Sequence, residues 1–413
     1  MSGATAAERA GRAGSEGLLW ILGAGRLIGA AGAFVALSFF TIYLRTDLGL
    51  GLETVGAIAA LISVGALAGS FLAGYAADRF GRRPALLMNL AVETLSLAAL
   101  AAFHAPLPVA AIGLVLGLAD GGLWPTFGAA VADILPPARR QGGFALMGAS
   151  VNAGAAIGPA VGGLLLPLGF GHLFGVAAVG VCLALLALAL RLPETRPTGA
   201  APGAGAADDA GGGYGVVLRD GPVLVLLALL LLPLTCMGLL ITFFPLAADA
   251  TPGVGPERFG LLFALWGVFI AVFQIPVTRL VGRVRPVSAM AWGFALMAAG
   301  FVPIALLPGV WGYLAGIVAL AFGEMLNSPP IGALVANLAP LGARARYQSL
   351  LALVWSFGGV IAPLAAGMVY GRMSHAAFWL AAGVLALAPA PLLPLWRLRH
   401  ARVRLAEEAA RAV

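Results

Sequence analysis

Four charged residues interrupt long apolar stretches of this sequence of 413 residues: Arg26, Glu93, Asp120 and Glu324. A charge inside the hydrocarbon of a membrane is costly unless it is paired or hydrated, so such a residue is a candidate for function. Asp120 and Glu324 lie near the middle of their stretches, and a buried carboxyl group suits the uptake and release of a proton or cation. We predict that role for this pair. The alternative is that each acid only hydrogen-bonds a neighbouring helix.

Arg26 and Glu93 form the second group of charged candidates. Each follows the start of its apolar stretch by about nine residues, which places the two at similar depth if both stretches are helices. Glu93 is then as well suited to be an internal partner of Arg26 as a ligand of a substrate. We rank this pair behind Asp120 and Glu324 for coupling.

Several polar and aromatic residues of the apolar stretches are weaker candidates for a substrate pocket. Trp124 follows Asp120 by four residues, and Asn327 follows Glu324 by three, so each shares a helix face with an acid. The alternative for all of them is helix packing or lipid contact. The pocket candidates are Trp124, Asn152, Trp266, Gln274, Asn327 and Trp355.

The apolar stretches are the elements that must position these residues. Hydrophobic residues make up 61% of the chain and charged residues 10%, which is too little charge to cover a water-soluble surface. A helical span needs about 20 mostly apolar residues. Twelve such stretches are predicted, at about 17–44, 53–76, 84–104, 108–134, 142–166, 171–191, 221–247, 258–281, 287–307, 311–336, 347–370 and 375–396. The chain is therefore predicted to be an all-α integral membrane protein.

The spacing of these spans and the arginines predicts domain organisation and orientation. The predicted parts are a tail (1–16), a six-helix bundle (17–192), a Gly/Ala/Pro-rich linker (193–218), a second bundle (219–397) and a tail (398–413). All 24 basic residues are arginine. With the N-terminus inside, twenty of them face the cytoplasm, as the positive-inside rule requires. Both termini are predicted to be cytoplasmic.

The two halves of the sequence align with each other at an offset of 204 residues. The offset superimposes Pro125 on Pro329, Arg140 on Arg344 and Pro159 on Pro363, and it also relates Asp120 to Glu324. Six spans per half is an even number, so both copies enter the membrane in the same direction. Parallel repeats of this kind place a substrate site near the middle of the membrane, between the halves.

The loop between the second and third spans carries a conspicuous motif, Gly74-Tyr-Ala-Ala-Asp78-Arg79-Phe-Gly81-Arg82-Arg83. It resembles the G-x-x-x-D-R-x-G-R-R signature of the major facilitator superfamily. The resemblance implies the major facilitator fold and a cytoplasmic latch between the halves, with roles for Gly74, Asp78, Arg79, Gly81, Arg82 and Arg83. The alternative is an arginine cluster that only fixes topology.

A second motif lies in the fifth span, where Gly154, Gly158, Pro159, Gly162 and Gly163 follow the pattern G-x-x-x-G-P-x-x-G-G. It resembles the motif of exporting, proton-antiporting members of the superfamily, and overall the chain is most similar to the twelve-span drug:proton antiporter group. Two positions depart from that group. Ala145 replaces a glycine upstream of the motif, and Gly113 replaces a buried arginine of the fourth span, which puts coupling through that arginine in doubt.

The resemblance and the buried acids together imply a secondary transporter, with proton-coupled efflux of small amphipathic or drug-like molecules favoured. A proton-coupled importer of a small metabolite is the alternative, and a non-transporting membrane receptor the next. No nucleotide-binding, zinc-protease or serine-nucleophile motif is present, so an enzyme is not expected. We expect no catalytic residue, metal site or cofactor, with the proton gradient as the energy source. The expected partners are a small-molecule substrate, protons and the lipid bilayer, and no nucleic acid is expected to bind. We expect a monomer in the cytoplasmic membrane.

Overall fold

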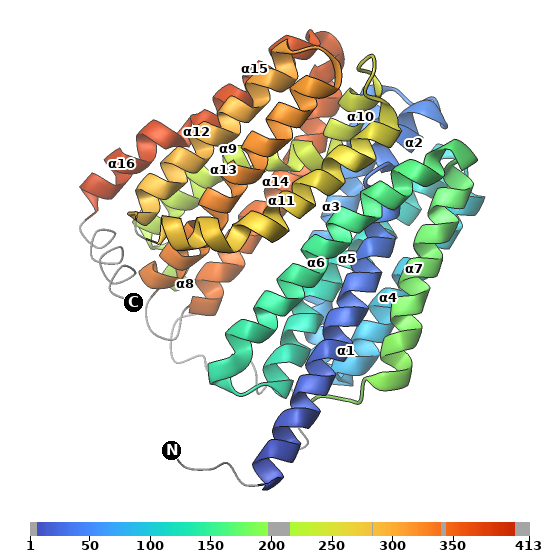
Figure 1. Cartoon of the computed structure of the whole chain (residues 1–413), viewed down its shortest axis with the longest axis vertical. Helices are drawn as coiled ribbons and strands as arrows, with labels where there is room; N and C mark the ends of the chain where they lie inside the picture. Colours follow the sequence, from blue (N-terminus) through green and yellow to red (C-terminus); the bar gives the residue numbers. More distant parts are fainter. Residues whose placement is uncertain (1–5, 197–214, 283, 340–343, 401–413) are drawn as a thin grey trace. The chain divides into compact units, whose positions relative to one another are not determined.

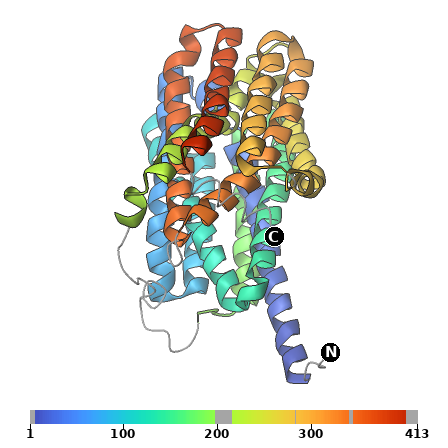
Figure 2. The same cartoon turned by 90° about the vertical axis from the view of Figure 1, so that its left-hand side faces the viewer.

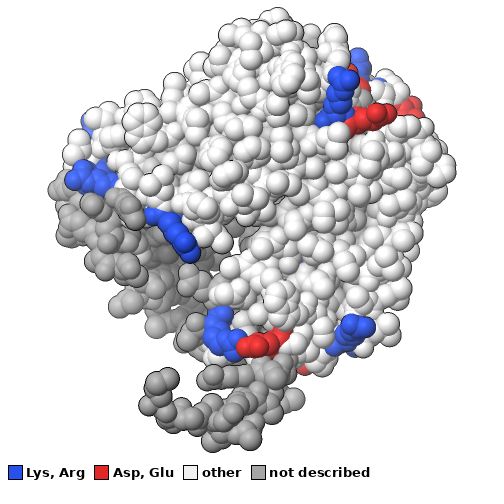
Figure 3. All heavy atoms as spheres, viewed as in Figure 1, with Lys and Arg blue, Asp and Glu red and all other residues white. Residues whose placement is uncertain are grey.

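The computed structural model describes residues 6–196, 215–282, 284–339 and 344–400, and every regular element there is a helix (Figure 1). Twelve of the helical stretches are long and apolar enough to cross a membrane. The number of spans and the all-α class are therefore confirmed. In Figure 3 the broad middle of the visible face carries almost no charged side chain, and the arginines and acids gather toward its ends.

The chain divides into two compact units, of which unit 1 comprises Met1–Leu37 and Leu61–Gly205. Its first helix, α1, extends at its N-terminal end beyond the helices packed around it (Figure 2). The helices of unit 1 are α1 (Ala6–Leu37), the larger part of α3 (Leu52–Phe80), α4 (Arg82–Ala102), α5 (Pro106–Ile134), α6 (Pro137–Leu165), η1 (Leu166–Leu168) and α7 (Phe170–Arg191).

Unit 2 comprises Ser38–Ala60 and Ala206–Val413, so it includes α2 (Phe40–Thr46) and the first turns of α3. Glu53 of α3 forms an ion pair of 2.6 Å with Arg372 in this unit. The remaining helices of unit 2 are α8 (Gly215–Leu218), α9 (Gly221–Thr242), α10 (Phe244–Asp249), α11 (Gly255–Val281), α12 (Pro286–Leu306), α13 (Gly309–Leu338), α14 (Arg344–Val369), η2 (Tyr370–Arg372), α15 (His375–Leu387) and α16 (Pro389–Arg399).

Three predicted spans consist of two consecutive helices each: α1 with α2, α9 with α10, and α15 with α16. Pro245 and Pro389 lie in the first turns of α10 and α16. Proline lacks a backbone N–H and is accommodated in a first helical turn, which favours a new helix start at these points. Most of the predicted linker (residues 197–214), residues 1–5 and the tail from 401 onward lie outside the described residues.

Equivalent helix contacts in the two units follow the sequence repeat. In unit 1 a Cβ atom added at Gly154 of α6 would come within 2.7 Å of Ala30 and Ala31 of α1. In unit 2 the same addition at Gly358 of α14 would come within 3.0 Å of Leu234 and Thr235 of α9. Each of these unit 2 residues stands 204 positions after its counterpart, so both glycines allow the same close approach of two backbones. The chain is built from two six-helix parallel repeats.

Gly154→Leu is expected to destabilise the protein by about 1–3 kcal/mol, because the added side chain has no room against α1. The matched control is Gly148→Ala in the same helix, where an added Cβ meets nothing within 4 Å. The control should melt at or slightly above the wild-type temperature. Thermal unfolding of the purified proteins measures both. Equal melting temperatures for Gly154→Leu and wild type would contradict the close α1/α6 contact.

Candidate functional site

Three of the predicted charged residues meet inside unit 1 and form what we call the buried charge cluster: Arg26, Glu93 and Asp120. They come from α1, α4 and α5 respectively. Arg26 is 9% exposed and Glu93 only 1%. Arg26 interacts electrostatically with both acids.

Several polar atoms of this cluster lack a hydrogen-bond partner. Both carboxylate oxygens of Glu93, and the Nε atom of Arg26, are buried without a hydrogen-bond partner among the described residues. The guanidinium of Arg26 lies 5.4 Å from the ring centre of Phe127, so part of its charge faces an aromatic ring. Two carboxyl groups and one guanidinium leave one excess negative charge when all are ionised. One proton or one monovalent cation would neutralise the cluster.

The repeat counterpart of Asp120 in unit 2 is Glu324 of α13. Its Oε2 atom has no hydrogen-bond partner among the described residues. The indole nitrogen of Trp266 on α11 lies near this carboxyl group, outside hydrogen-bond geometry. The neighbouring residues Ala321, Met325 and Ile270 are buried and apolar. Glu324 therefore has no cation beside it in the described part of unit 2, in contrast to Asp120.

The structure groups the charged candidates differently from the sequence pattern. The sequence paired Asp120 with Glu324 by the repeat and Arg26 with Glu93 by depth. In unit 1, Asp120 joins Arg26 and Glu93 in one cluster. Sequence spacing gives the depth of a residue but not the rotation of its helix, so it did not indicate that α5 turns Asp120 toward Arg26.

The weaker pocket candidates are dispersed. Asn327 is buried, and its amide donates to Met297 Sδ of α12 at 3.1 Å, while Gln274 donates to Thr278 Oγ1 at 3.0 Å. These two amides therefore take part in packing within unit 2. Exposed surface remains on Trp124 (56%), Trp355 (40%) and Asn152.

One polar residue that sequence reasoning missed is Asn89 of α4, which is buried and packs against Gly122 of α5. In unit 2 the arrangement is reversed, because Asn327 on α13 packs against Gly293 of α12. Gly293 is the repeat counterpart of Asn89. Both units therefore place an asparagine side chain between the two equivalent helices, but on the first helix of the pair in unit 1 and on the second in unit 2. In the sequence, only the 204-residue alignment could have suggested this.

The predicted latch motif lies at the end of unit 1 where α3 gives way to α4. Gly81 separates the two helices with a φ of 107°, a conformation that residues with a side chain rarely adopt. Arg82 Nε donates to Asp133 Oδ2 of α5 at 2.8 Å, and Arg79 donates to the Tyr75 hydroxyl at 2.7 Å. Gly74 lies within α3, and the side chain of Asp78 lies outside the described part of the structure.

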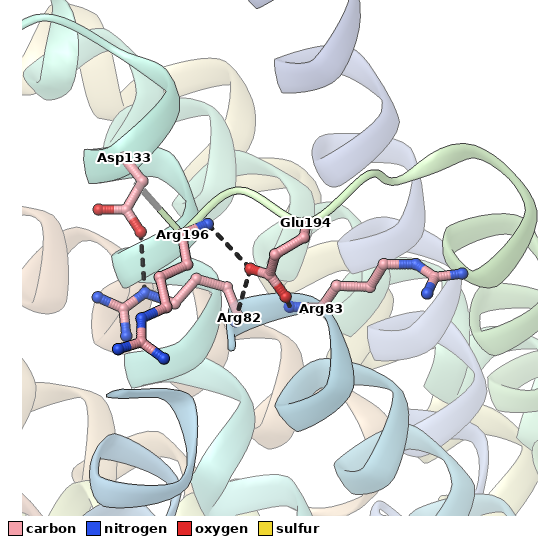
Figure 4. A network of polar contacts seen from close by, with 5 residues as sticks. All are labelled: Arg82, Arg83, Asp133, Glu194 and Arg196. Carbon is pink, nitrogen blue, oxygen red and sulfur yellow. Dashed lines mark hydrogen bonds and ion pairs between the residues drawn. The ribbon is translucent and has the colours of Figure 1, made fainter. Parts of the chain in front are cut away.

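Glu194, which follows α7, is the residue that organises this loop (Figure 4). Its carboxylate accepts hydrogen bonds from the backbone N–H groups of Arg82 at 2.9 Å, Arg83 at 3.3 Å and Arg196 at 2.9 Å. It thereby supplies acceptors for donors at the start of α4 that have no partner within the helix. We call Arg82, Arg83, Asp133, Glu194 and Arg196 the loop network. Sequence reasoning assigned Glu194 to the linker because that segment is rich in Gly, Ala and Pro. Its separation of more than 100 residues from the motif gave no sign of the contact.

Glu194→Ala is expected to destabilise unit 1 by about 1 kcal/mol, because three backbone N–H groups lose a charged acceptor at a partly solvated site. Glu16→Ala is the matched control, since Glu16 forms one exposed ion pair with Arg139. Such pairs contribute roughly 0–1 kcal/mol. Thermal unfolding compares the two variants. A larger loss in Glu16→Ala than in Glu194→Ala would contradict the capping role.

The glycines of the fifth-span motif serve the packing of α6. A Cβ atom at Gly158 would come within 2.6 Å of Phe34 of α1, and Gly162 and Gly163 are buried. Pro159 lies inside α6. A proline within a helix removes a backbone hydrogen bond and permits a bend there. The motif thus combines close backbone packing with a point where the helix can bend.

Comparison with known proteins agrees with this architecture. The sequence profile of the Major Facilitator Superfamily matches residues 22–253 and 237–412. A Na(+), Li(+), K(+)/H(+) antiporter of Planococcus maritimus is 24% identical over 80% of this chain and 84% of its own length. The class G tetracycline resistance protein of Vibrio anguillarum is 27% identical over 83% of this chain and 88% of its own.

The fold also matches a solved structure of similar length. The crystal structure of the peptide transporter POT in complex with sulfate superimposes with a TM-score of 0.75, covering 94% of this chain and 96% of that one at 20% identity. The relatives and structural neighbours are transporters and not enzymes. With its two helical repeats, twelve spans and matching profile, this multi-pass membrane protein belongs to the Major Facilitator Superfamily and is a transporter of that family.

Proposed function

We propose that the protein exports small amphipathic or drug-like molecules across the cytoplasmic membrane in exchange for protons, by alternating access. Transport of this kind needs a group that takes up a proton on one side and releases it on the other. The buried charge cluster of unit 1 and Glu324 of unit 2 supply three carboxyl groups for that purpose. No cofactor is required, because the proton gradient provides the free energy.

The observation that carries the proposal is the charge balance of the buried charge cluster. Two acids surround one arginine, and both carboxylate oxygens of Glu93 lack a hydrogen-bond partner among the described residues. An ionised carboxylate without a partner is costly in a low-dielectric interior. The cluster is therefore most stable when it holds one proton, and loss of that proton would favour a different conformation.

The direction of transport is supported by the relatives and by the fifth-span motif. One relative is named for tetracycline resistance and another for antiport against H(+). The likeness to a peptide transporter concerns the fold alone, and import of a small metabolite remains the second candidate because Gly113 replaces the arginine typical of exporters.

A resistance panel in a host that lacks its own efflux pumps tests the proposal. Expression of the wild type should raise the inhibitory concentration of some amphipathic compounds, tetracycline and ethidium among them, and Asp120→Asn at equal membrane level should not. Increased sensitivity of cells expressing the wild type to a toxic metabolite analogue would instead support import. Identical inhibitory concentrations for wild type and Asp120→Asn would contradict the coupling role.

Orientation can be tested independently of substrate. We expect reporter fusions after Arg83 and after Arg140 to be cytoplasmic, and a fusion near Thr251 to be external, because the arginine-rich loops then remain inside. A fluorescent reporter active only in the cytoplasm and a phosphatase active only outside measure the two states. Inversion of any of the three positions would contradict the orientation.

A further inference from the structure

A groove of about 700 Å³ opens on unit 1 at the arginine-rich ends of its helices. Its walls come from three helices: Leu18 of α1, Arg83 and Pro84 of α4, and the last residues of α7 through Arg191. The groove lies beside the loop network, because Glu194 forms part of its rim.

The groove lies at the end of a candidate membrane span. Arg191 is the last residue of a membrane span, so its side chain reaches the level where hydrocarbon gives way to the polar interface. Leu190 beside it is 83% exposed and offers an apolar surface next to the two arginines. A ligand that combines a negative group with a hydrocarbon chain would fit these two arginines and the apolar surface beside them.

Hydrogen-bond donors in the groove lack acceptors. Arg83 donates through one terminal nitrogen to the Ala189 carbonyl at 2.8 Å, which holds its guanidinium against the end of α7 at the groove wall. Arg191 has no ion pair or side-chain hydrogen bond to another described residue. Glu194 on the rim accepts backbone N–H groups with both oxygens and keeps its negative charge, so Arg83, Arg191 and Glu194 together leave the groove one net positive charge.

We propose that this groove binds the phosphate of an anionic phospholipid, with Arg83 and Arg191 as donors and an acyl chain lying along Leu190. Guanidinium groups form strong, directional hydrogen bonds with phosphate oxygens. The exposed leucine favours a lipid over a free phosphate ion. A lipid held here joins the start of α4 to the end of α7, so it reinforces the contact that Glu194 makes between them.

The test uses the purified full chain and needs no transport substrate. Melting temperature is measured in neutral detergent with added phosphatidylglycerol, phosphatidylcholine or inorganic phosphate. We expect phosphatidylglycerol alone to raise the melting temperature of the wild type by several degrees, because a ligand that binds only the folded state stabilises it. Arg191→Gln should lose most of that rise. The same rise with inorganic phosphate or with phosphatidylcholine would overturn the assignment to an anionic lipid.

Two further variants control the result. Arg139→Gln removes one arginine at the same end of unit 1 but outside the groove, and it should keep the full rise. Arg191→Lys retains the positive charge and should recover part of it. Native mass spectrometry counts bound lipid directly, so a variant with lowered stability is still informative. Equal retention of phosphatidylglycerol by wild type and Arg191→Gln would overturn the proposal.

Discussion

Asp120→Asn is expected to abolish transport driven by a proton gradient while leaving energy-independent exchange of substrate partly intact. Asparagine keeps the shape and hydrogen-bonding capacity of the side chain but cannot exchange a proton. The variant should still fold, because Arg26 retains Glu93 as a partner in the buried charge cluster. Uphill flux and exchange are measured on the same proteoliposomes. The comparison distinguishes a defect in proton coupling from a defect in substrate binding.

Glu324→Gln provides the comparison in unit 2. It removes an acid that has no cation beside it in the described structure, whereas Asp120→Asn removes one that faces Arg26. If both acids serve the same proton, the double variant should be no worse than the more defective single variant. Wild-type uphill rates and wild-type pH dependence in both single variants would contradict the coupling role and leave Glu93 as the coupling candidate.

Arg26→Gln is expected to be the most destabilising single substitution in the cluster. It leaves two buried carboxyl groups without a cation, and removing one partner of a buried ion pair costs about 3–5 kcal/mol. We expect a low yield in the membrane and a strongly lowered melting temperature. Arg45→Gln is the control, because the exposed Arg45 donates to the Leu50 carbonyl in a loop and should tolerate the change.

The double variant Arg26→Gln/Asp120→Asn tests whether charge or packing causes the loss. It removes one positive and one negative group and so restores the net charge of the wild-type cluster, and yield and melting temperature should recover part of what Arg26→Gln loses. If the double variant is as unstable as Arg26→Gln, the contact of Arg26 with Phe127 and its packing carry the stability, and the charge-balance account is wrong.

Patterns along the chain predicted the features that depend on depth and on repetition. Twelve spans follow from the length of apolar stretches, and the repeat follows from prolines and glycines at one offset. The same offset relates the Gly154 and Gly358 contacts in the structure. Depth alone also placed Arg26 and Glu93 at one level, and the two do meet in the cluster.

Features that depend on helix rotation or on loop conformation could not be predicted in this way. The position of Asp120 beside Arg26 requires the rotation of α5, which an apolar span does not reveal because its hydrophobic residues surround the helix on all sides. Glu194 reaches the latch motif only through the fold of the segment after α7. The break between α1 and α2 at Ser38 and Phe39 has neither proline nor glycine to indicate it.

Proton movement driven by substrate directly tests the proposed exchange of substrate for protons. Liposomes with an acidic interior and a trapped pH-sensitive dye receive a compound to which expression of the protein confers resistance. We expect the interior to become more alkaline as the compound enters wild-type liposomes, and we expect no such change with Asp120→Asn or in protein-free liposomes. Accumulation of the compound in wild-type liposomes at the same rate with and without the pH gradient, with no change in interior pH, would contradict it.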